Sequence, residues 1–373
     1  MPIPSTLTAA SPPSTVSTAS APPAVRLTAL DGLRGLSMLG MVLVNFRLAM
    51  GVEASADAGL GSLFLALEGR TAAIFVTLAG MGLVMGAARQ PLAQARSQAL
   101  RRAFWLAVMG LLNLLIFPAD ILHFYACYFA LGALFLGRSG RLCMALALLL
   151  PLLYVAALFR WSYDSGWDWQ TLSYIDLWQP QGFVRHLLFN GFHPVLPWMA
   201  FFLWGMGLAR LPLQQRPVQW RLMLGGASVF LICLGVREGV ALWLPAWAPL
   251  WGTTPLPPGP LYMFSAGALA TALVGAALLA LPDWAALRAL GRSTLSVYLA
   301  HILLGMGLLE SAGLLSGRSL AEVLALGLGF GALALLGCWV WLRRFPQGPV
   351  EMLMRRLIRK PGQFSRLEAG GSP

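Results

Sequence analysis

Apolar residues recur along this chain in windows of about 19 positions, separated by short segments rich in polar residues, glycine or proline. A bilayer core of about 30 Å needs roughly 20 apolar residues per helix, so each window is long enough to cross it. Candidate helices lie near 34–52, 70–88, 102–118, 120–137, 141–160, 194–211, 220–244, 260–281, 293–314 and 320–342. The pattern predicts an all-α, polytopic transmembrane helical bundle with about ten spans.

The basic residues are distributed unevenly between the predicted connections. In a ten-span topology, 20 of the 26 Lys and Arg residues fall on one side of the membrane. The positive-inside rule assigns that side to the cytoplasm, and with an even number of spans both chain ends lie there. Ten of the 14 acidic residues fall on the other side, which is therefore slightly acidic.

Composition agrees with a membrane protein and divides the chain into three parts. Hydrophobic residues make up 58% of the chain and charged residues 11%, too apolar a balance for a soluble globular protein. We expect a Pro/Ser/Thr/Ala-rich disordered cytoplasmic arm over 1–25, a membrane domain over 26–345 and a basic cytoplasmic tail over 346–373. The net charge of +12 is spread between apolar segments, which argues against a nucleic-acid partner and favours contacts with the lipid bilayer.

The four cysteines give no sign of a metal site or a disulfide framework. Each lies inside an apolar segment, without C-x-x-C spacing or neighbouring ligands: Cys127, Cys143, Cys233 and Cys338. We therefore expect no metal and no permanently bound cofactor.

Two predicted external connections are long and rich in aromatic residues. These are 161–193, with Trp and Asp, and 245–259, with Pro and Trp. Such residues are typical of interfacial anchors, and lining the mouth of a substrate site is the alternative.

Polar side chains within the spans are the candidate functional residues, because each must find a partner, a water-filled cavity or a function. Nearly all of them lie toward the external half. They are Asn45, Arg47, Glu68, Arg70, Asp120, His123, His193, Arg237, Glu238, His301 and Glu310, with Tyr298 three positions before His301. Neutral imidazole can take and return a proton, and Arg can hold a phosphate, carboxylate or oxyanion, so a cavity with both would suit acyl transfer.

Each histidine also has a structural interpretation. His123 follows Asp120 by three positions, so the pair shares a helix face and is either functional or an interfacial cap. His301 lies near mid-membrane and must face protein or water. His193 precedes a proline at a helix entrance, where a polar residue costs little.

Two charged pairs also have structural interpretations. Glu68 and Arg70 flank Gly69 at an interface, where an ion pair is as good an explanation as substrate contact. Asp31 and Arg34 lie one turn apart at the start of the first span, where the helix dipole and an i,i+3 pairing explain both.

Five segments, taken in order, resemble a superfamily of transmembrane acyltransferases. The group includes heparan-α-glucosaminide N-acetyltransferase-like proteins, acyltransferase type 3 proteins and YeiB-type bacterial membrane proteins, and the first and last subgroups are the most similar. The segments are 26–46 (RLTALDGLRGLSMLGMVLVNF), 69–82 (GRTAAIFVTLAGMG), 120–126 (DILHFYA), 192–198 (FHPVLPW) and 290–301 (LGRSTLSVYLAH).

The resemblance implies transfer of an acyl group, with acetyl expected, from cytoplasmic acyl-CoA to an acceptor such as a sugar on the external side of a bacterial inner membrane. Acyl-CoA would be a donor substrate, and a homodimer is one option for the assembly. The family histidine that follows the Val-Asn pair has no counterpart after Asn45, so the base would be His123, His193 or His301.

The resemblance also suggests roles for the other candidates. Asp120 would support the base, and Arg70 or Arg237 would stabilise the oxyanion. Further acceptor contacts would come from Asn45, Glu68, Glu238 and Tyr298. The donor-side residues are Asp31, Arg34, Arg101 and Arg102, and their arginines would attract the CoA phosphates.

Two other functions use the same residues. A proton-coupled transporter of a small molecule or lipid-linked intermediate would use Asp120, Glu238 or Glu310 as its coupling carboxylate. A non-catalytic membrane protein would keep the fold without the chemistry, since fold does not fix function.

Overall fold

The computed structural model of the protein describes residues 27–54, 58–248 and 250–358. The predicted arm, 1–25, and the end of the predicted tail lie outside these ranges. The described residues are almost entirely helical. In chain order the α-helices are α1 (Thr28–Ala49), α2 (Ala58–Leu67), α3 (Arg70–Ala87), α4 (Leu92–Leu114), α5 (Leu122–Phe135), α6 (Gly140–Arg160), α7 (Pro180–Arg185), α8 (Val195–Leu208), α9 (Arg216–Trp243), α10 (Pro260–Ala280), α11 (Ala285–Arg292), α12 (Thr294–Ala300), α13 (Gly307–Ser311), α14 (Leu320–Trp341) and α15 (Pro349–Ile358).

Short irregular elements join these helices. Two π-helical segments, η2 (His186–Asn190) and η4 (His301–Met306), continue α7 and α12, and a 3-10 turn, η3 (Pro245–Trp247), follows α9. After α6 the chain forms a small antiparallel hairpin of β1 (Trp167–Asp168) and β2 (Ser173–Tyr174).

Local sequence explains where several helices begin. The Ser139 hydroxyl accepts a hydrogen bond from the Leu142 amide and caps α6. Ser319 and Glu322 form a reciprocal capping box at the start of α14, and Pro260 occupies the first turn of α10, where no backbone donor is needed.

The all-α polytopic bundle is confirmed, whereas the ten-span count is only partly matched. Among the described residues, seven helices are long and apolar enough to cross a membrane, and the bent pair Pro180–Asn190 and Val195–Leu208 would make eight. Every predicted span corresponds to a helix, but α4 carries three arginines and α5 has 14 residues. These two pack on each other as an antiparallel pair within the bundle.

The helices differ in how much of their surface is covered by protein. Helix α1 contacts α3, α11 and α14 and is buried on most of its surface, and α8 packs on α3 and α6. Helix α9 packs mainly on α10 and leaves most of its surface exposed, as does α14. The core therefore lies around α1, α3, α5, α8 and α10, where Trp198, Tyr128 and Tyr262 are fully buried.

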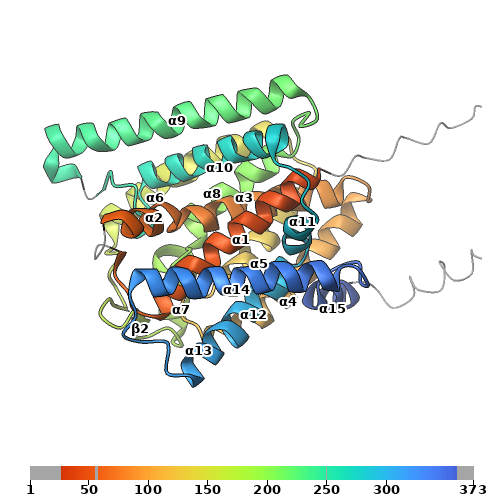
Figure 1. The fold of residues 1–373 in the computed structure, drawn as a ribbon. Helices are drawn as coiled ribbons and strands as arrows, with labels where there is room; N and C mark the ends of the chain where they lie inside the picture. Colours follow the sequence, from red (N-terminus) through yellow and green to blue (C-terminus); the bar gives the residue numbers. More distant parts are fainter. Residues whose placement is uncertain (1–26, 55–57, 249, 359–373) are drawn as a thin grey trace, which may run out of the picture.

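Most of the long helices run side by side, so the bundle has two ends (Figure 1). The start of α1, with α11 and α15, lies at one end, while β2, α7 and α13 lie at the other. The first end carries the predicted cytoplasmic arginines, and we name it the basic end. The opposite end carries the predicted external connections, and we name it the outer end.

Candidate functional site

A cavity of about 460 Å³ opens at the outer end. Its walls come from the last turns of α1, the start of α3, the segments 163–172 and 255–257, and the entrance to α8. Its polar lining residues are Asn45, Arg47, Glu68, Thr71, Tyr163, Asp164, Trp169, His193, Trp198 and Tyr298. Residues of both long connections thus line this cavity.

A second cavity, of about 300 Å³, lies at the basic end. It is bounded by α1, α3, α4, α5, α11, α12 and the segment that leads into α15. Its polar lining residues are Asp31, Arg34, Arg102, Tyr125, Arg292, Thr294, Tyr298, Gln347 and Glu351. Three arginines face this cavity, which makes it suited to an anionic ligand.

The two cavities meet at a thin partition. Met41, Ile121 and Tyr298 line both of them. Groups entering from opposite ends of the bundle would therefore approach each other at the Tyr298 side chain.

Asp120 lies directly behind this partition in a closed hydrogen-bond network. Its side chain is fully buried, and one carboxylate oxygen accepts from Asn113 Nδ2 at 2.7 Å and from the Tyr298 hydroxyl at 3.1 Å. The other oxygen accepts from the His123 amide at 3.2 Å and His123 Nδ1 at 2.9 Å. Tyr298 in turn accepts from the Ile121 amide at 3.1 Å. Asp120 therefore both caps the start of α5 and fixes the partition.

His301 orients Asn45 toward the outer cavity. The His301 Nδ1 atom is hydrogen-bonded to the Tyr298 carbonyl oxygen. Because a carbonyl oxygen can only accept, Nδ1 is the donor and carries the proton. His301 Nε2 then accepts from Asn45 Nδ2 at 3.0 Å. The Nε2 lone pair of His301 is thus occupied by the hydrogen bond from Asn45. Asn45 lines the outer cavity, whereas His301 lines neither cavity.

His193 is the histidine that lines the outer cavity. Its ring packs edge-on against Trp198 at 4.5 Å between centroids, and its Nδ1 is buried without a partner among the described residues. The rings of His123 and His186 also pack against Phe124, but these two histidines line neither cavity.

The charged residues of the outer end fall into two groups. Arg47 donates to Glu68 at 2.9 Å, and both line the outer cavity. Arg70 instead donates to the carbonyls of Leu65 and Thr253, outside the lining.

Arg237 pairs with its neighbour Glu238 near the outer end of α9, also outside the lining. Arg47 is therefore the arginine best placed to face a reacting group in this cavity, a role that sequence reasoning gave to Arg70 or Arg237.

Three of the four predicted donor-side residues line the basic cavity. Arg34 donates to Asp31 at 3.4 Å and to the Leu78 carbonyl at 3.3 Å, and Arg102 lies over the Phe129 ring. Arg101 is turned away and donates to the Ile358 carbonyl of α15 at 3.0 Å.

Sequence reasoning missed two charged residues of the basic cavity. Arg292 lies in the segment 290–301, so its place in that motif was the available signal. Glu351, in the predicted tail, accepts from the amides of Leu295 and Ser296 and so ties α15 to the start of α12.

The predicted motifs match known families. The profile described as heparan-alpha-glucosaminide N-acetyltransferase, catalytic, matches residues 26–244, more than half of the chain. The chain belongs to this family. A second profile, described as a protein of unknown function (DUF418), matches residues 206–361. Searches of curated proteins and of solved structures found no significant match.

Membership of the N-acetyltransferase family, together with the apolar helices, identifies an integral membrane protein and indicates a membrane acetyltransferase-like activity. In this family member the two cavities contain no group of three or more His, Cys, Asp or Glu side chains that could hold a metal ion, within the part of the chain that the structure describes.

The segment 163–176, which lines one side of the outer cavity in this family member, is held by a network of hydrogen bonds. Asn190 makes most of these bonds: its Nδ2 donates to the carbonyls of Tyr163 and Ser165, both at 2.7 Å. Its Oδ1 accepts from the Tyr174 hydroxyl at 2.7 Å, and its carbonyl accepts from Trp167 Nε1 at 2.6 Å. Burial raises the pKa of Tyr163 and Tyr174, so both hydroxyls stay protonated.

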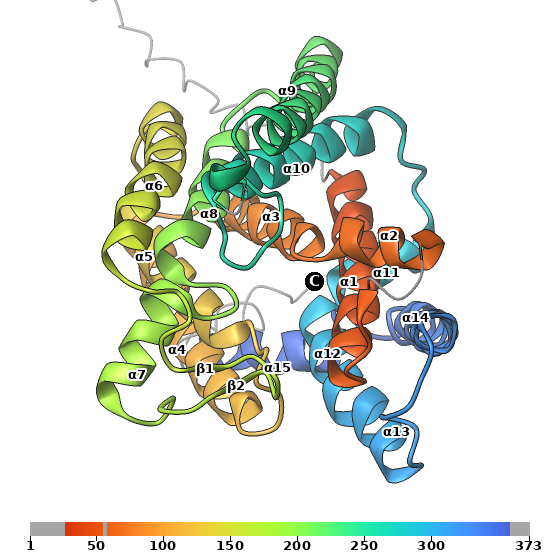
Figure 2. The ribbon, with the colours of Figure 1, turned by 90° about the vertical axis from the view of Figure 1, so that its left-hand side faces the viewer.

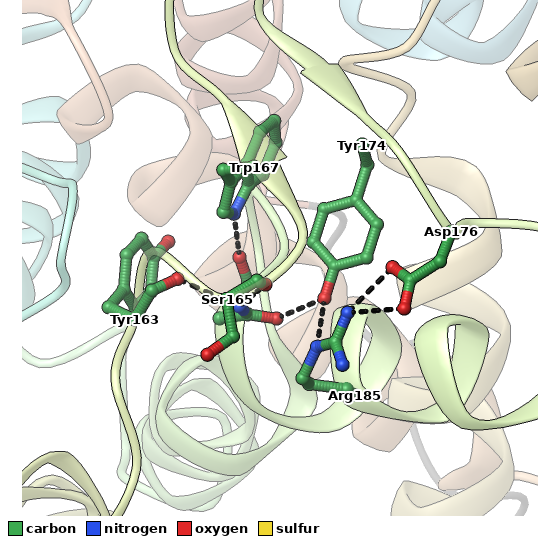
Figure 3. A network of polar contacts seen from close by, with 7 residues as sticks. Tyr163, Ser165, Trp167, Tyr174, Asp176 and Arg185 are labelled. Carbon is green, nitrogen blue, oxygen red and sulfur yellow. Dashed lines mark hydrogen bonds and ion pairs between the residues drawn. The ribbon is translucent and has the colours of Figure 1, made fainter.

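An ion pair closes the same network. Arg185 donates from Nε to the Tyr174 hydroxyl at 2.7 Å and from Nη2 to both carboxylate oxygens of Asp176, at 2.6 and 2.8 Å (Figure 3). The network fixes 163–176 as one unit, and Tyr163 and Trp169 of that unit reach the outer cavity.

Proposed function

We propose that the protein transfers an acyl group, acetyl in the first instance, from cytoplasmic acyl-CoA in the basic cavity to an amine or hydroxyl of a sugar-like acceptor in the outer cavity. The observation that carries the proposal is the partition of Met41, Ile121 and Tyr298, which both cavities share. A thioester and an acceptor entering from opposite ends would meet at this partition without either substrate crossing the membrane.

Charge supports the assignment of the donor to the basic cavity. Arg34, Arg102 and Arg292 face it, and arginine is the residue best suited to phosphate groups. Glu351 also lines the basic cavity, and its carboxylate would repel a phosphate group bound close to it.

The histidine geometry supports His193 as the general base. In this scheme His193 takes the proton of the acceptor N–H or O–H, the acceptor atom bonds to the thioester carbon, and the carbon–sulfur bond breaks. The CoA thiolate leaves through the basic cavity and takes up a proton. Asn45, held by His301, and Arg47 would then face the charge that develops on the carbonyl oxygen.

The test is label transfer from radiolabelled acetyl-CoA to a panel of amino sugars and neutral sugars, with the full chain reconstituted in vesicles of known orientation. Transfer should require donor at the basic end and acceptor at the outer end. Transfer with both substrates on one side, or no donor binding at millimolar concentration, would overturn the proposal.

Matched variants sharpen the test. Arg102→Gln should raise the KM for acetyl-CoA several-fold, whereas its neighbour Arg101→Gln should leave it nearly unchanged, because Arg101 does not line the cavity. His193→Gln should lower kcat at least about 100-fold, whereas His186→Gln, whose ring packs against Phe124 outside both linings, should not.

A transporter is the second candidate, because two cavities separated by three side chains also suit alternating access. The structure distinguishes its possible coupling carboxylates. Asp120 is fully hydrogen-bonded, Glu238 is paired at the surface, and Glu310 lines a separate cavity of about 350 Å³ beside the outer one. Uptake driven by a pH gradient without acyl-CoA would favour this candidate.

A further inference from the structure

A further cavity, of about 320 Å³, lies on the flank of the bundle and shares no lining residue with the three cavities described above. Helices α6, α8, α9 and α10 enclose it. Small side chains make it hollow, among them Ala147, Ala200, Gly225, Gly226 and Gly267. Its lining is almost wholly apolar, as expected for a surface that faces lipid chains.

The groove exists because α9 packs mainly on α10. Gly226 and Gly275 bring the two backbones together: a Cβ on Gly226 would lie 2.5 Å from the Ala272 nitrogen, and one on Gly275 would lie 2.4 Å from the Met223 nitrogen. On the adjoining face of α9, a Cβ on Gly225 would meet nothing within 4 Å. Figure 2 shows α6 and α9 standing apart at the margin of the bundle.

The polar groups of the groove are nearly all satisfied. Trp204 Nε1 donates to the Thr271 hydroxyl at 2.8 Å, and that hydroxyl donates to the Gly267 carbonyl at 2.8 Å. Arg221 is the exception. It lies in the second turn of α9 at the basic end, is exposed, and makes no hydrogen bond or ion pair with any described residue.

More positive charge lies at the same end. Arg216 begins α9, and Arg138 and Arg141 stand just before and at the start of α6, on the opposite wall of the groove. All three side chains are exposed. The groove is thus apolar along its length and has unpaired arginines at its basic end. A membrane lipid with an anionic head group has the same arrangement of apolar and charged parts.

We propose that this groove is a binding site for an anionic glycerophospholipid of the cytoplasmic leaflet. One acyl chain lies along α9 from Arg221 to Val229, a distance of about 12 Å, and the phosphate contacts the Arg221 guanidinium. The acyl chain fills a space that side chains leave empty. A net negative head group is favoured over a zwitterionic one, because the choline cation of the latter would lie near the arginines.

The site reaches the proposed acceptor cavity through two aromatic contacts. Phe201 lines the groove and packs on Trp198 at 5.2 Å between centroids, and Trp198 packs on His193 at 4.5 Å. A lipid chain against Phe201 therefore supports the wall that holds His193. This consequence rests on the proposed function, whereas the lipid site itself does not.

The experiment is native mass spectrometry of the full chain, delipidated in detergent and titrated with phosphatidylglycerol or phosphatidylcholine. Phosphatidylglycerol should bind at least about tenfold more tightly, which corresponds to about 1.4 kcal/mol. Arg221→Gln should remove that preference, whereas Arg344→Gln, an exposed arginine that follows α14 and lies outside the lining, should keep it.

A second pair of variants tests the place of the acyl chain. A Cβ at Gly225 meets nothing within 4 Å, so Gly225→Trp should place its ring in the groove and abolish tight lipid binding. Gly235→Trp, at an equally open Cβ position on the same helix but outside the lining, should not. Equal binding by both glycine variants, or equal affinity for the two lipids, would overturn the proposal. Neither readout involves acyl-CoA, so a failure of the proposed transferase activity would not affect it.

Discussion

The surroundings of each imidazole distinguish the three candidate histidines. His301 uses its lone pair on Asn45, His123 points its Nδ1 at Asp120, and His193 borders the outer cavity. Sequence alone placed all three near the outer half and left the choice of base open, because a motif gives the position of an imidazole along a helix but not the direction of its nitrogens. The aspartate, by contrast, was correctly linked to His123 from the i,i+3 spacing.

Asp120 should be the polar side chain whose replacement costs most stability. Asp120→Asn keeps the shape but replaces one acceptor oxygen with an amide donor, so two buried donors among Asn113, Tyr298 and His123 lose their acceptor. We expect a loss of at least about 2 kcal/mol. Thermal unfolding in detergent should show a clearly lower midpoint than for Asp168→Asn, whose carboxylate at the end of β1 accepts, among the described residues, only from the neighbouring Gln170 and Thr171. Equal midpoints for the two variants would contradict this network.

At the scale of the helix, α3 and α8 approach so closely that only glycine fits between them. A Cβ on Gly80 would lie 2.0 Å from the Phe202 carbonyl oxygen, whereas one on Gly86 of the same helix would meet nothing within 4 Å. Gly80→Ala should therefore separate the helices and sharply reduce the yield of folded protein. Gly86→Ala should be neutral or stabilising by up to about 1 kcal/mol. Size-exclusion profiles and unfolding midpoints of the pair measure the difference, and a normal profile for Gly80→Ala would refute the contact.

The segment 163–176 beside the outer cavity should become more mobile as a unit when the Asn190 side chain is removed. Asn190→Ala deletes two bonds to backbone carbonyls and one from Tyr174. We expect chymotrypsin, which cleaves at aromatic residues, to cut between 161 and 179 at least about tenfold faster, since opening costs about 1–3 kcal/mol less when these bonds are lost. Asp168→Asn, which affects only an exposed turn of the hairpin, is the control. Unchanged cleavage in Asn190→Ala would show that packing alone holds the segment.

Element boundaries show what hydrophobic windows can and cannot predict. The long apolar helices α6 and α14 were found within a few residues, because their largely exposed surfaces make nearly every position apolar. Helix α4 begins about ten residues before its predicted window, since its basic first half faces α5 and the basic cavity instead of lipid. The short helix α2 and the hairpin were missed, because tertiary contacts at the outer end decide them.

At the scale of the whole molecule, the two cavities lie at opposite ends of the bundle. The orientation of the protein in the membrane can therefore be tested independently of catalysis. The start of α1 and helix α15 lie at the basic end, and the hairpin lies at the outer end (Figure 1). The charge distribution predicts that the basic end faces the cytoplasm. Single cysteines at Asp168 and at Arg138, in a background with Cys127, Cys143, Cys233 and Cys338 replaced, report the two sides. A membrane-impermeant maleimide should label Asp168→Cys in intact cells and Arg138→Cys only after permeabilisation. The reverse pattern would place the arginine-lined cavity outside the cell, where acyl-CoA is not supplied, and would remove the basis for the proposed donor site while leaving the fold as described.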